Sequence, residues 1–355
     1  MGCPRKNYGR KRHTATISLI TMSKKGVNSV PTSQIDFSVI MPTFNSAKTI
    51  LKALDSIRNQ NYLQTAIEIL VIDGGSSDQT LEIAKQYNCI ILNNPLKNPE
   101  EAKKIGIQEA KGLYLVFQDS DEEVLDQESF QTRAEIFKKN PRLQHLVTRG
   151  LRVPDGYSDF AYYMNSVGDP FNYSLLHQDG ADLYLSYKSR LITQSENKNS
   201  IVLVFSNSQG TPILDACGHT IRAEKDSKKQ NFNYLFFTSM RKNSQFAILK
   251  DSYTNHYSNA TFLSILKKIL FRIKSNLTKK PTAGYVNRGE AGTNKHIFII
   301  YALSIVWPLY DGIVLATRYK KMIFLLHPLF TLFTFAMIVW AIIFYKEHSS
   351  VLEYG

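Results

Sequence analysis

The stretch that decides the fold runs from residue 36 to residue 123. It contains three similar segments, which read FSVIMPTFN at 37–45, IEILVIDGGSSD at 67–78 and LYLVFQDSD at 113–121. Each begins with a short apolar run and ends in polar residues, and helical patterns lie between them. Short apolar runs that alternate with helices are typical of βαβ units. Because ligands bind beyond the carboxyl ends of strands in such sheets, we expect the three polar ends to face one site.

The segments between and beyond these runs predict further elements. Apolar residues at intervals of three or four predict a helix over 46–59. Asp78 is placed to cap a second helix over 78–87. Farther along, residues 183–187 and 201–205 have the composition of strands. The sequence therefore predicts an α/β domain whose second half is less regular than its first.

Charge is distributed unevenly along the 355 residues, whose net charge is +13. Residues 1–35 carry seven Lys or Arg and no acid, and residues 262–296 carry eight against one acid. Basic segments of this kind bind nucleic acid or anionic membrane lipids. The second segment directly precedes long apolar runs, so we expect anionic lipids and no nucleic acid as partners. The remainder is close to neutral and, at 43% hydrophobic residues overall, the chain can form a substantial core.

Residues 1–35 are expected to be a disordered basic arm. Lys6 stands where an N-myristoylation signal needs Ser or Thr, so that pattern fails. The apolar patch at 17–20 is too short for the core of a signal peptide. The three cysteines are widely spaced and fit neither a zinc site nor a disulfide framework, which agrees with a reducing compartment.

A basic amphipathic helix is predicted over residues 261–275. Apolar residues recur there at helical spacing, and basic residues lie opposite or beside them. Such a helix suits a membrane interface, with its lysines on lipid head groups. The same pattern also fits an ordinary surface helix packed on the core. The apolar residues are Leu263, Leu266, Ile269, Leu270 and Ile273, and the basic ones are Lys267, Lys268, Arg272 and Lys274.

Two apolar runs follow, at 297–317 and 322–345. As a helix, the second would span ~36 Å, enough for the hydrocarbon core of a bilayer. We predict a transmembrane hairpin whose turn is 318–321. That turn holds three basic residues, and a hairpin would place them on the far side, against the positive-inside tendency. In the alternative, residues 297–317 are re-entrant or lie in the membrane interface, and only residues 322–345 cross the membrane. Asp311 is costly in lipid and should face protein or a polar cavity.

The pair Asp119 and Asp121 directly follows an apolar run. Two carboxylates one residue apart at a strand end can hold a hard divalent cation, and that ion can carry a diphosphate. Asp-x-Asp is common in loops, but here two similar strand ends precede it in the chain. We therefore expect a hard divalent cation at this position.

Four motifs, in order, resemble those of family 2 glycosyltransferases of the GT-A fold. Residues 37–45 resemble the family's first strand, which ends in Pro-x-Tyr/Phe-Asn, and 71–80 resemble Val-Ile-Asp-Asp/Gly-Gly-Ser-x-Asp-x-Thr. Residues 102–112 resemble the Ala-Arg-Asn-x-Gly-Ile helix, and 117–121 resemble Phe-Leu-Asp-x-Asp. The resemblance implies a Rossmann-like mixed sheet flanked by helices, here followed by an amphipathic juxtamembrane helix and transmembrane helices.

The resemblance also implies roles for the matching residues. Asp73 would hydrogen-bond the nucleobase, and Lys103 would meet the diphosphate unless it is a solvated helix lysine. Asp119 would contact the ribose or a metal-bound water, and Asp121 would bind Mg2+ or Mn2+. His256 resembles a histidine of membrane-associated members, and it either meets a phosphate or is packed. The implied donor-binding residues are Pro42, Thr43, Phe44, Asn45, Asp73, Gly75, Lys103 and Asp119, and the implied metal ligands are Asp119 and Asp121.

The family's catalytic base is missing from its usual place. Residues 215–222 resemble the family's acceptor-side segment, after which a Glu-Asp pair normally follows. Residues 231–234 read Asn-Phe-Asn-Tyr and contain no acid. An inverting transfer needs a carboxylate near the acceptor hydroxyl as general base. Asp215, Glu224 and Asp226 are candidates, and we choose Asp215, which also fits a turn.

These features predict an inverting, metal-dependent glycosyltransferase. It would move a sugar from a UDP- or GDP-sugar to a lipid-linked glycan in cell-surface polysaccharide or glycoconjugate synthesis. Polyprenyl phosphate is the alternative acceptor, and the missing base also allows a catalytically inactive nucleotide-sugar-binding scaffold. Because the donor is cytosolic, we expect the catalytic domain on the cytoplasmic face of the inner or plasma membrane.

The expected organisation has five parts. They are the arm at 1–35, a GT-A domain at 36–225 (donor half 36–123, acceptor half 124–225), a juxtamembrane segment at 226–296, the hairpin at 297–345 and a tail at 346–355.

Overall fold

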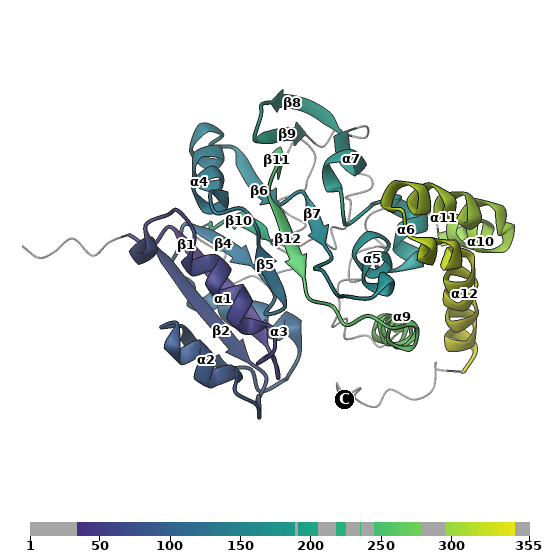
Figure 1. Ribbon diagram of the computed structural model, residues 1–355, viewed down its shortest axis with the longest axis horizontal. Coiled ribbons are helices and arrows are strands. Elements are labelled where there is room, and N and C mark those ends of the chain that lie inside the picture. Colours follow the sequence, from purple (N-terminus) through teal and green to yellow (C-terminus); the bar gives the residue numbers. More distant parts are fainter. Residues whose placement is uncertain are drawn as a thin grey trace, which may run out of the picture. The chain divides into compact units, whose positions relative to one another are not determined.

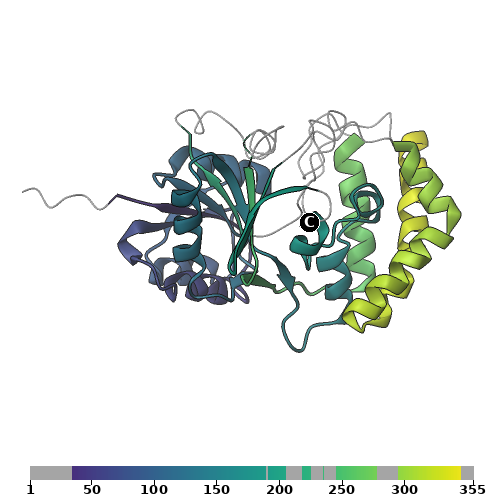
Figure 2. The ribbon, with the colours of Figure 1, turned by 90° about the horizontal axis from the view of Figure 1, so that it is seen from above.

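The computed structural model describes most of the chain (Figures 1 and 2). The described residues are 34–188, 191–204, 218–224, 235, 245–277 and 295–344. Among the predictions that lie outside these ranges are the bases Asp215 and Asp226, the arm up to residue 33 and the tail from residue 346.

The strands of the described residues form two sheets. The larger has nine strands in the order β3-β2-β1-β4-β10-β6-β11-β9-β8, and the smaller has the order β5-β12-β7. β1 is parallel to both β2 and β4, whereas β10 is antiparallel to β4 and β6. The strands are β1 Phe37–Thr43, β2 Ile67–Asp73, β3 Ile90–Asn93, β4 Tyr114–Phe117, β5 Glu122–Val124, β6 Leu143–Val147, β7 Gly150–Arg152, β8 Ile192–Glu196, β9 Ser200–Val204, β10 His219–Arg222, β11 Gln245–Leu249 and β12 Tyr253–His256.

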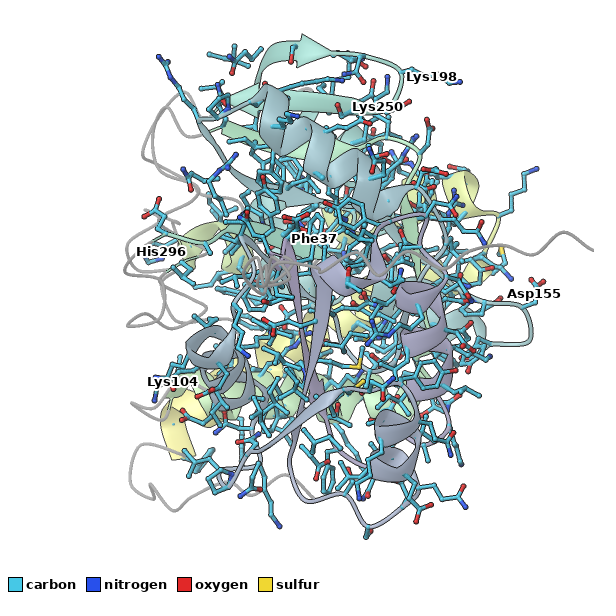
Figure 3. The ribbon with its side chains drawn as sticks, turned by 90° about the vertical axis from the view of Figure 1, so that its left-hand side faces the viewer. Phe37, Lys104, Asp155, Lys198, Lys250 and His296 are labelled. Carbon is cyan, nitrogen blue, oxygen red and sulfur yellow. The ribbon has the colours of Figure 1, made fainter. Side chains whose placement is uncertain are left out.

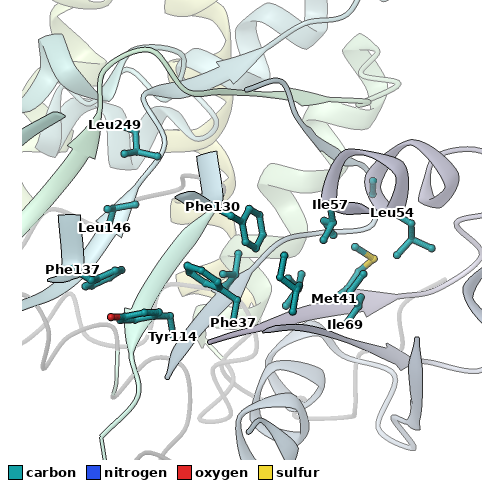
Figure 4. Packing of buried hydrophobic residues seen from close by; sticks show 14 of the residues in the cluster. Phe37, Met41, Leu54, Ile57, Ile69, Tyr114, Phe130, Phe137, Leu146 and Leu249 are labelled. Atoms are coloured by element: carbon teal, nitrogen blue, oxygen red, sulfur yellow. The ribbon is translucent and has the colours of Figure 1, made fainter. Parts of the chain in front are cut away.

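Helices cover both faces of the larger sheet, because its central strands are apolar on both sides. Successive side chains of a strand point to opposite faces. Phe37 and Met41 of β1 pack with helices α1 and α4, as Figure 4 shows, and Ile40 packs with α3. The helices of this part are α1 Ile50–Arg58, α2 Thr80–Gln86, α3 Pro99–Glu109, α4 Ser129–Lys139, α5 Asp159–Ser166, α6 Pro170–Leu176 and α7 Leu183–Lys188.

The expected class, a GT-A-type mixed α/β sheet flanked by helices, is confirmed, but two local expectations differ from the structure. Residues 183–187 form helix α7, not a strand. Leu183 and Tyr187, four residues apart, are both buried, while Leu185 between them is exposed. The sheet also continues past residue 225, where we expected the domain to end, because β11 pairs with β6 and β9.

Four further helices follow the sheets: α9 Phe262–Leu277, α10 Lys295–Ser304, α11 Val306–Tyr319 and α12 His327–Phe344, with a short 3-10 helix at Met322–Leu326 before α12. The apolar ridge of α9 consists of Ile265, Ile269 and Ile273, and it is buried in one cluster with α5 and α12. This packing favours the alternative of a helix on the core. Leu263, expected on the same apolar face, is exposed.

One helix of the described residues, Met322–Phe344, is long and apolar enough to cross a membrane. Residues 296–304 and 306–319 would supply a second crossing only as a single span, and the two are bent by 78° relative to one another. Asp311 of α11 is buried among protein groups, as we expected.

Candidate active site

The carboxyl ends of β1, β2 and β4 lie next to one another and carry the three polar segments. Thr43 of β1 is opposite Asp73 of β2. On the other side of β1, Ile40 is opposite Phe117 of β4. This register gathers the residues that follow the three strands at one edge of the sheet, as the sequence predicted.

The Asp73 carboxylate organises the loop that follows β2. Its Oδ2 accepts hydrogen bonds from the backbone N–H groups of Gly75 and Ser76, at 2.9 Å each, and its Oδ1 accepts one from the Ser76 hydroxyl at 2.5 Å. Gly75 has φ +93°, a conformation that side chains other than glycine rarely adopt. Asp73 and Gly75 therefore fix the backbone of this edge in addition to any contact with a ligand.

Asn45 joins the loop after β1 to the loop after β2. Its side-chain oxygen accepts from the Ser77 N–H at 2.9 Å, and its own N–H donates to the Ser76 hydroxyl at 2.8 Å. Pro42 is half-buried, and Phe44 is 53% exposed at the same edge. An exposed aromatic ring beside two tied loops is a suitable stacking surface for a planar ligand.

Asp78 ties these loops to the helix that follows. Its carboxylate accepts hydrogen bonds from the Ala47 N–H at 3.0 Å and from the Thr80 N–H at 3.1 Å. The hydrogen bond from the Thr80 hydroxyl is the main cause that lowers the pKa of Asp78. Asp78 is therefore structural, although the N-cap residue of α2 is Gln79 and not, as we expected, Asp78.

Asp119 and Asp121 lie just beyond β4 with a third carboxyl group, that of Glu122. The Asp119 N–H donates to the Glu122 carboxylate at 3.2 Å, and Glu122 is buried. The Asp121 carbonyl accepts from the Tyr257 N–H at 2.8 Å. Ser120, between the two aspartates, donates to the Ser46 hydroxyl at 2.8 Å. These bonds hold the segment in place between β4 and the smaller sheet.

The pKa is raised for two acids of this segment and lowered for the third. Asp119 is exposed at this edge, but partial desolvation by the surrounding protein raises its pKa, and the positive charge of Lys103 opposes that shift. Desolvation also raises the pKa of Glu122 well above its usual value, and the charges of Asp119 and Asp121 add to the effect. Asp121 differs: although desolvation opposes it, the hydrogen bond and charge of His256 hold its pKa below the usual value. So much negative charge in one place favours a bound cation.

His256 comes from β12 and lies beside Asp121, at 3.4 Å from Nε2 to Oδ2. Its Nδ1 is 2.8 Å from the Asn165 side-chain oxygen, an acceptor that places the proton on Nδ1. His256 is thus held in one orientation, next to the carboxylate pair. Sequence reasoning left His256 open between a phosphate contact and simple packing, because a lone histidine before a basic helix has no spacing signal.

Two lysines supply positive charge to the carboxylates. Lys103 of α3 is mostly buried, with 18% of its side chain exposed, and its Nζ lies 3.7 Å from Oε1 of Glu100. The burial disfavours the alternative of a solvated lysine. Lys268 of α9 acts electrostatically on both Asp119 and Asp121. Lys268 is exposed, so the contact with lipid head groups that we expected for the basic residues of this helix stays a prediction.

The two aspartates fit a divalent cation whose coordination is completed by substrate. Among the described residues, no group of three or more His, Cys, Asp or Glu side chains is arranged to hold an ion. Mg2+ commonly binds one or two carboxylates together with substrate phosphates, so the pair suffices when a diphosphate is present. Of the candidate bases, Glu224 is exposed just after β10, and Asp215 and Asp226 lie outside the described ranges.

Comparison with models of protein families identifies the family of the segment that forms this edge. The model of the family described as Glycosyl transferase family 2 matches residues 38–197, which include the ends of β1, β2 and β4. Residues 38–197 form a family 2 glycosyltransferase domain. The four motifs that suggested this family therefore identified it correctly.

Curated relatives of the family 2 domain match it in part. Glycosyltransferase AglE of Haloferax volcanii is 36% identical over 97 residues, which cover 25% of this chain and 32% of the relative. The dolichyl N-acetyl-alpha-D-glucosaminyl phosphate 3-beta-D-2,3-diacetamido-2,3-dideoxy-beta-D-glucuronosyltransferase of Methanococcus voltae is 32% identical over 116 residues, with coverage of 30% and 36%. Poly(ribitol-phosphate) beta-N-acetylglucosaminyltransferase TarS of Staphylococcus aureus is 35% identical over 92 residues, with coverage of 24% and 16%. The chain thus spans 16% to 36% of the length of these relatives.

Solved structures resemble a larger part of the chain at lower identity. The mannosyltransferase PcManGT from Pyrobaculum calidifontis, in complex with GDP-Man and Mn2+, has a TM-score of 0.48 and 13% identity, and 89% of this chain and 91% of that one are covered. S. aureus TarS 1–349 in complex with UDP-GlcNAc has a TM-score of 0.44 and 17% identity, with coverage of 86% and 88%.

Proposed function

We propose that the chain is an inverting glycosyltransferase that moves a sugar from a UDP- or GDP-sugar to a lipid-linked acceptor. The observation that carries the proposal is the position of Asp119 and Asp121. They lie just beyond β4, beside the loops after β1 and β2, within a family 2 domain. A pair of carboxylates at a loop-lined sheet edge can hold a metal-bound diphosphate.

The residues that follow β1, β2 and β4 have different roles in donor binding. Asp73 and Asn45 keep the two loops in place, and Phe44 offers its exposed ring to the nucleobase. Asp119 and Asp121 would hold Mg2+ or Mn2+, which supplies positive charge to the diphosphate when bound. Lys103 approaches the same place, so it would offset charge that develops on the leaving group.

His256 is the third side chain that would serve the metal site. It lies beside Asp121, and Asn165 occupies its other ring nitrogen. Asn165 fixes the orientation of the ring, and Nε2 faces the Asp121 carboxylate. We infer that His256 supports the ion indirectly, because it orients Asp121 and favours its ionised form.

The names of two relatives support an acceptor that is a lipid or a polymer. One is named for a dolichyl-linked sugar phosphate and the other for poly(ribitol-phosphate). A lipid-linked glycan is our first choice, and polyprenyl phosphate itself is the alternative. Both agree with a catalytic domain at the cytoplasmic face of a membrane, close to the apolar helix Met322–Phe344. Asp215 is our proposed general base, since an inverting transfer needs a carboxylate near the acceptor hydroxyl.

A donor panel tests the proposed function. The full chain, with Mg2+ or Mn2+ and a membrane lipid extract, is incubated with labelled UDP- and GDP-sugars, and lipid products are analysed by mass spectrometry. We expect transfer from one donor class, and at least about a 100-fold loss of kcat in Asp121→Asn, because the variant weakens the charge that stabilises the leaving group. A phosphodiester-linked monosaccharide product would identify polyprenyl phosphate as the acceptor.

The matched control is Asp155→Asn, which changes an exposed aspartate between β7 and α5 that lies at the edge of the view in Figure 3. It should keep activity within about twofold, as surface substitutions generally do. Binding of a nucleotide sugar without any transfer, across the panel and with both metals, would favour the inactive scaffold and contradict the proposed enzyme.

A further inference from the structure

Helix α11 has a polarity opposite to that of a surface helix in water. Its one acid, Asp311, is only 9% exposed, whereas Val306, Trp307 and Tyr310 are 68%, 65% and 67% exposed. A helix at the surface of a water-soluble domain presents charged residues to solvent and apolar ones to the core. Ionisable residues that face inward and apolar residues that face outward are typical of helices in lipid.

Helices α10 and α12 share this polarity. On α12, His327, Thr331 and Thr334 have no exposed surface, and the two threonine hydroxyls donate to carbonyls of the same helix at 2.7 Å. We call the exposed apolar residues of the three helices the outer surface. It consists of Ile297, Ile299, Ile300, Leu303, Ile305, Val306, Trp307, Leu309, Tyr310, Ile313, Leu329, Val339, Trp340, Ile342, Ile343 and Phe344.

The polar groups on the inner side bond to each other and to the catalytic domain. The Tyr301 hydroxyl donates to Asp311 at 2.6 Å and lies 2.9 Å from Nε2 of His327. Nδ1 of His327 is 2.8 Å from the hydroxyl of Tyr163, which belongs to α5. His327 therefore connects α10 to the acceptor half of the enzyme. Polar contacts and the buried apolar residues Leu315, Phe330 and Ala341 fix the helices to the catalytic domain, and the remaining apolar residues face outward.

An apolar surface this extensive requires a cover, because water-soluble monomers rarely expose contiguous apolar patches of more than a few hundred Å². Lipid fits better than a protein partner for two reasons. Trp307, Tyr310 and Trp340 are of the types that gather where a membrane meets water. Exposed Lys320 continues the basic turn at the end of α11, and basic residues at this place attract anionic lipids.

The basic turn lies on the side of the catalytic domain. Arg318 contacts Asp179 at 2.8 Å, and Lys321 contacts Asp159 at 2.6 Å. At the other end of α11, Ile305 has φ +56° and marks the 78° bend to α10. As helices of 10 and 14 residues, α10 and α11 extend only ~15 Å and ~21 Å, too short to cross ~30 Å of hydrocarbon singly.

Helix α12 also packs against the rest of the chain along most of its length. The inner face of α12 is buried from His327 to Ala341, a distance of ~21 Å along a helix, and it packs against α9. If α12 crossed the bilayer, α9 would follow it and carry Lys267, Lys268 and Arg272 toward the hydrocarbon. Charged side chains are strongly disfavoured at that depth.

We propose that α10, α11 and α12 enter one leaflet through the outer surface and do not cross the bilayer. The end of α12 at Phe344 then lies on the same side as the catalytic domain. The positive-inside conflict of a hairpin disappears, because the turn at Arg318 and Lys321 never leaves that side. This inference is independent of the transfer reaction, since it depends only on contacts within the chain.

Cysteine labelling of the full chain in sealed membrane vesicles tests the topology. Single cysteines are introduced into a background with the three native cysteines changed to serine: Lys198→Cys in the catalytic domain, Lys320→Cys in the turn, and a cysteine in a tag after Gly355. Lys198 and Lys320 are both exposed. The fraction labelled by a membrane-impermeant maleimide is measured before and after detergent.

We expect the same fraction at all three positions, whatever the orientation of the vesicles. A tag cysteine that is protected where Lys198→Cys is labelled would mean that α12 crosses, and it would overturn the proposal. The lipid contact has its own test, in which Trp307→Glu with Tyr310→Glu should lower binding to vesicles of anionic and zwitterionic phospholipid at least tenfold. The control is Leu96→Glu, at an apolar residue 64% exposed elsewhere. Unchanged vesicle binding would overturn the lipid assignment in favour of a protein partner.

Discussion

At the scale of single residues, Lys268 is an exposed lysine of α9 whose positive charge lowers the pKa of Asp119 and of Asp121. The contact with lipid head groups that we expected for it stays a prediction. Lys268→Ala should raise KM for the donor about two- to fivefold with little change in kcat, because a largely exposed charge contributes modestly to binding. Initial rates at saturating acceptor measure this effect.

Lys267→Ala is the matched control for Lys268→Ala. Lys267 is also exposed on α9 and adjoins Lys268 in sequence. Its replacement should leave KM for the donor unchanged. Equal effects of the two substitutions on KM would indicate a general role of α9 charge, and they would contradict a specific contact of Lys268 with the diphosphate site.

The sequence could indicate Asp73, Asp119 and Asp121, because each follows an apolar run within a few residues and the three runs have similar endings. His256 could not be placed in the same way. It reaches Asp121 because β12 pairs with β5, with His256 opposite Glu122. That pairing joins distant parts of the chain, and no local pattern encodes it.

At the scale of elements, Gly106 sets how closely α3 approaches the sheet. A Cβ there would lie 2.4 Å from a side-chain methyl of Ile40 and 3.1 Å from Ile72. Gly106→Ala should therefore destabilise the fold by about 1–3 kcal/mol, the usual cost of overpacking. The same shift should weaken donor binding, because α3 also carries Lys103. Chemical denaturation in detergent and donor KM measure the two effects.

Lys104→Ala serves as the control on the same helix, since Lys104 projects outward from α3 and makes only an exposed ion pair with Glu101 (Figure 3). It should change stability by no more than about 0.5 kcal/mol. A Gly106→Ala variant as stable as the wild type would show that the sheet can move away from α3, contrary to the close contact described.

The helices and strands of the first half were predictable because each has one clear period. The errors lie where two patterns compete. LYLSY at 183–187 alternates like a strand, but an acceptor before it changes the outcome: the Asp182 carboxylate accepts from the Leu185 N–H at 3.1 Å and caps α7. In α9 the apolar residues are spread widely, and only packing on α12 decides that Ile265, Ile269 and Ile273 form the buried ridge.

At the scale of the whole molecule, the donor half followed from sequence and the C-terminal arrangement did not. Hydropathy gives the length of the apolar runs but not the partner of their polar residues. The decisive contacts, Arg318 with Asp179 and His327 with Tyr163, join the last helices to α5 and the segment after α6. Such contacts between distant segments appear only once the chain is folded.

The central claim is that the strand ends around Asp119 and Asp121 hold a nucleoside diphosphate through a divalent cation. The most direct test is isothermal titration of the full chain in detergent with UDP and with GDP, with Mn2+ or with EDTA. We expect one of the nucleotides to bind with Mn2+ present, at least tenfold weaker binding in EDTA, and no Mn2+ effect in Asp121→Asn. Binding that is equally strong with EDTA, or no binding of either nucleotide with Mn2+, would contradict the claim.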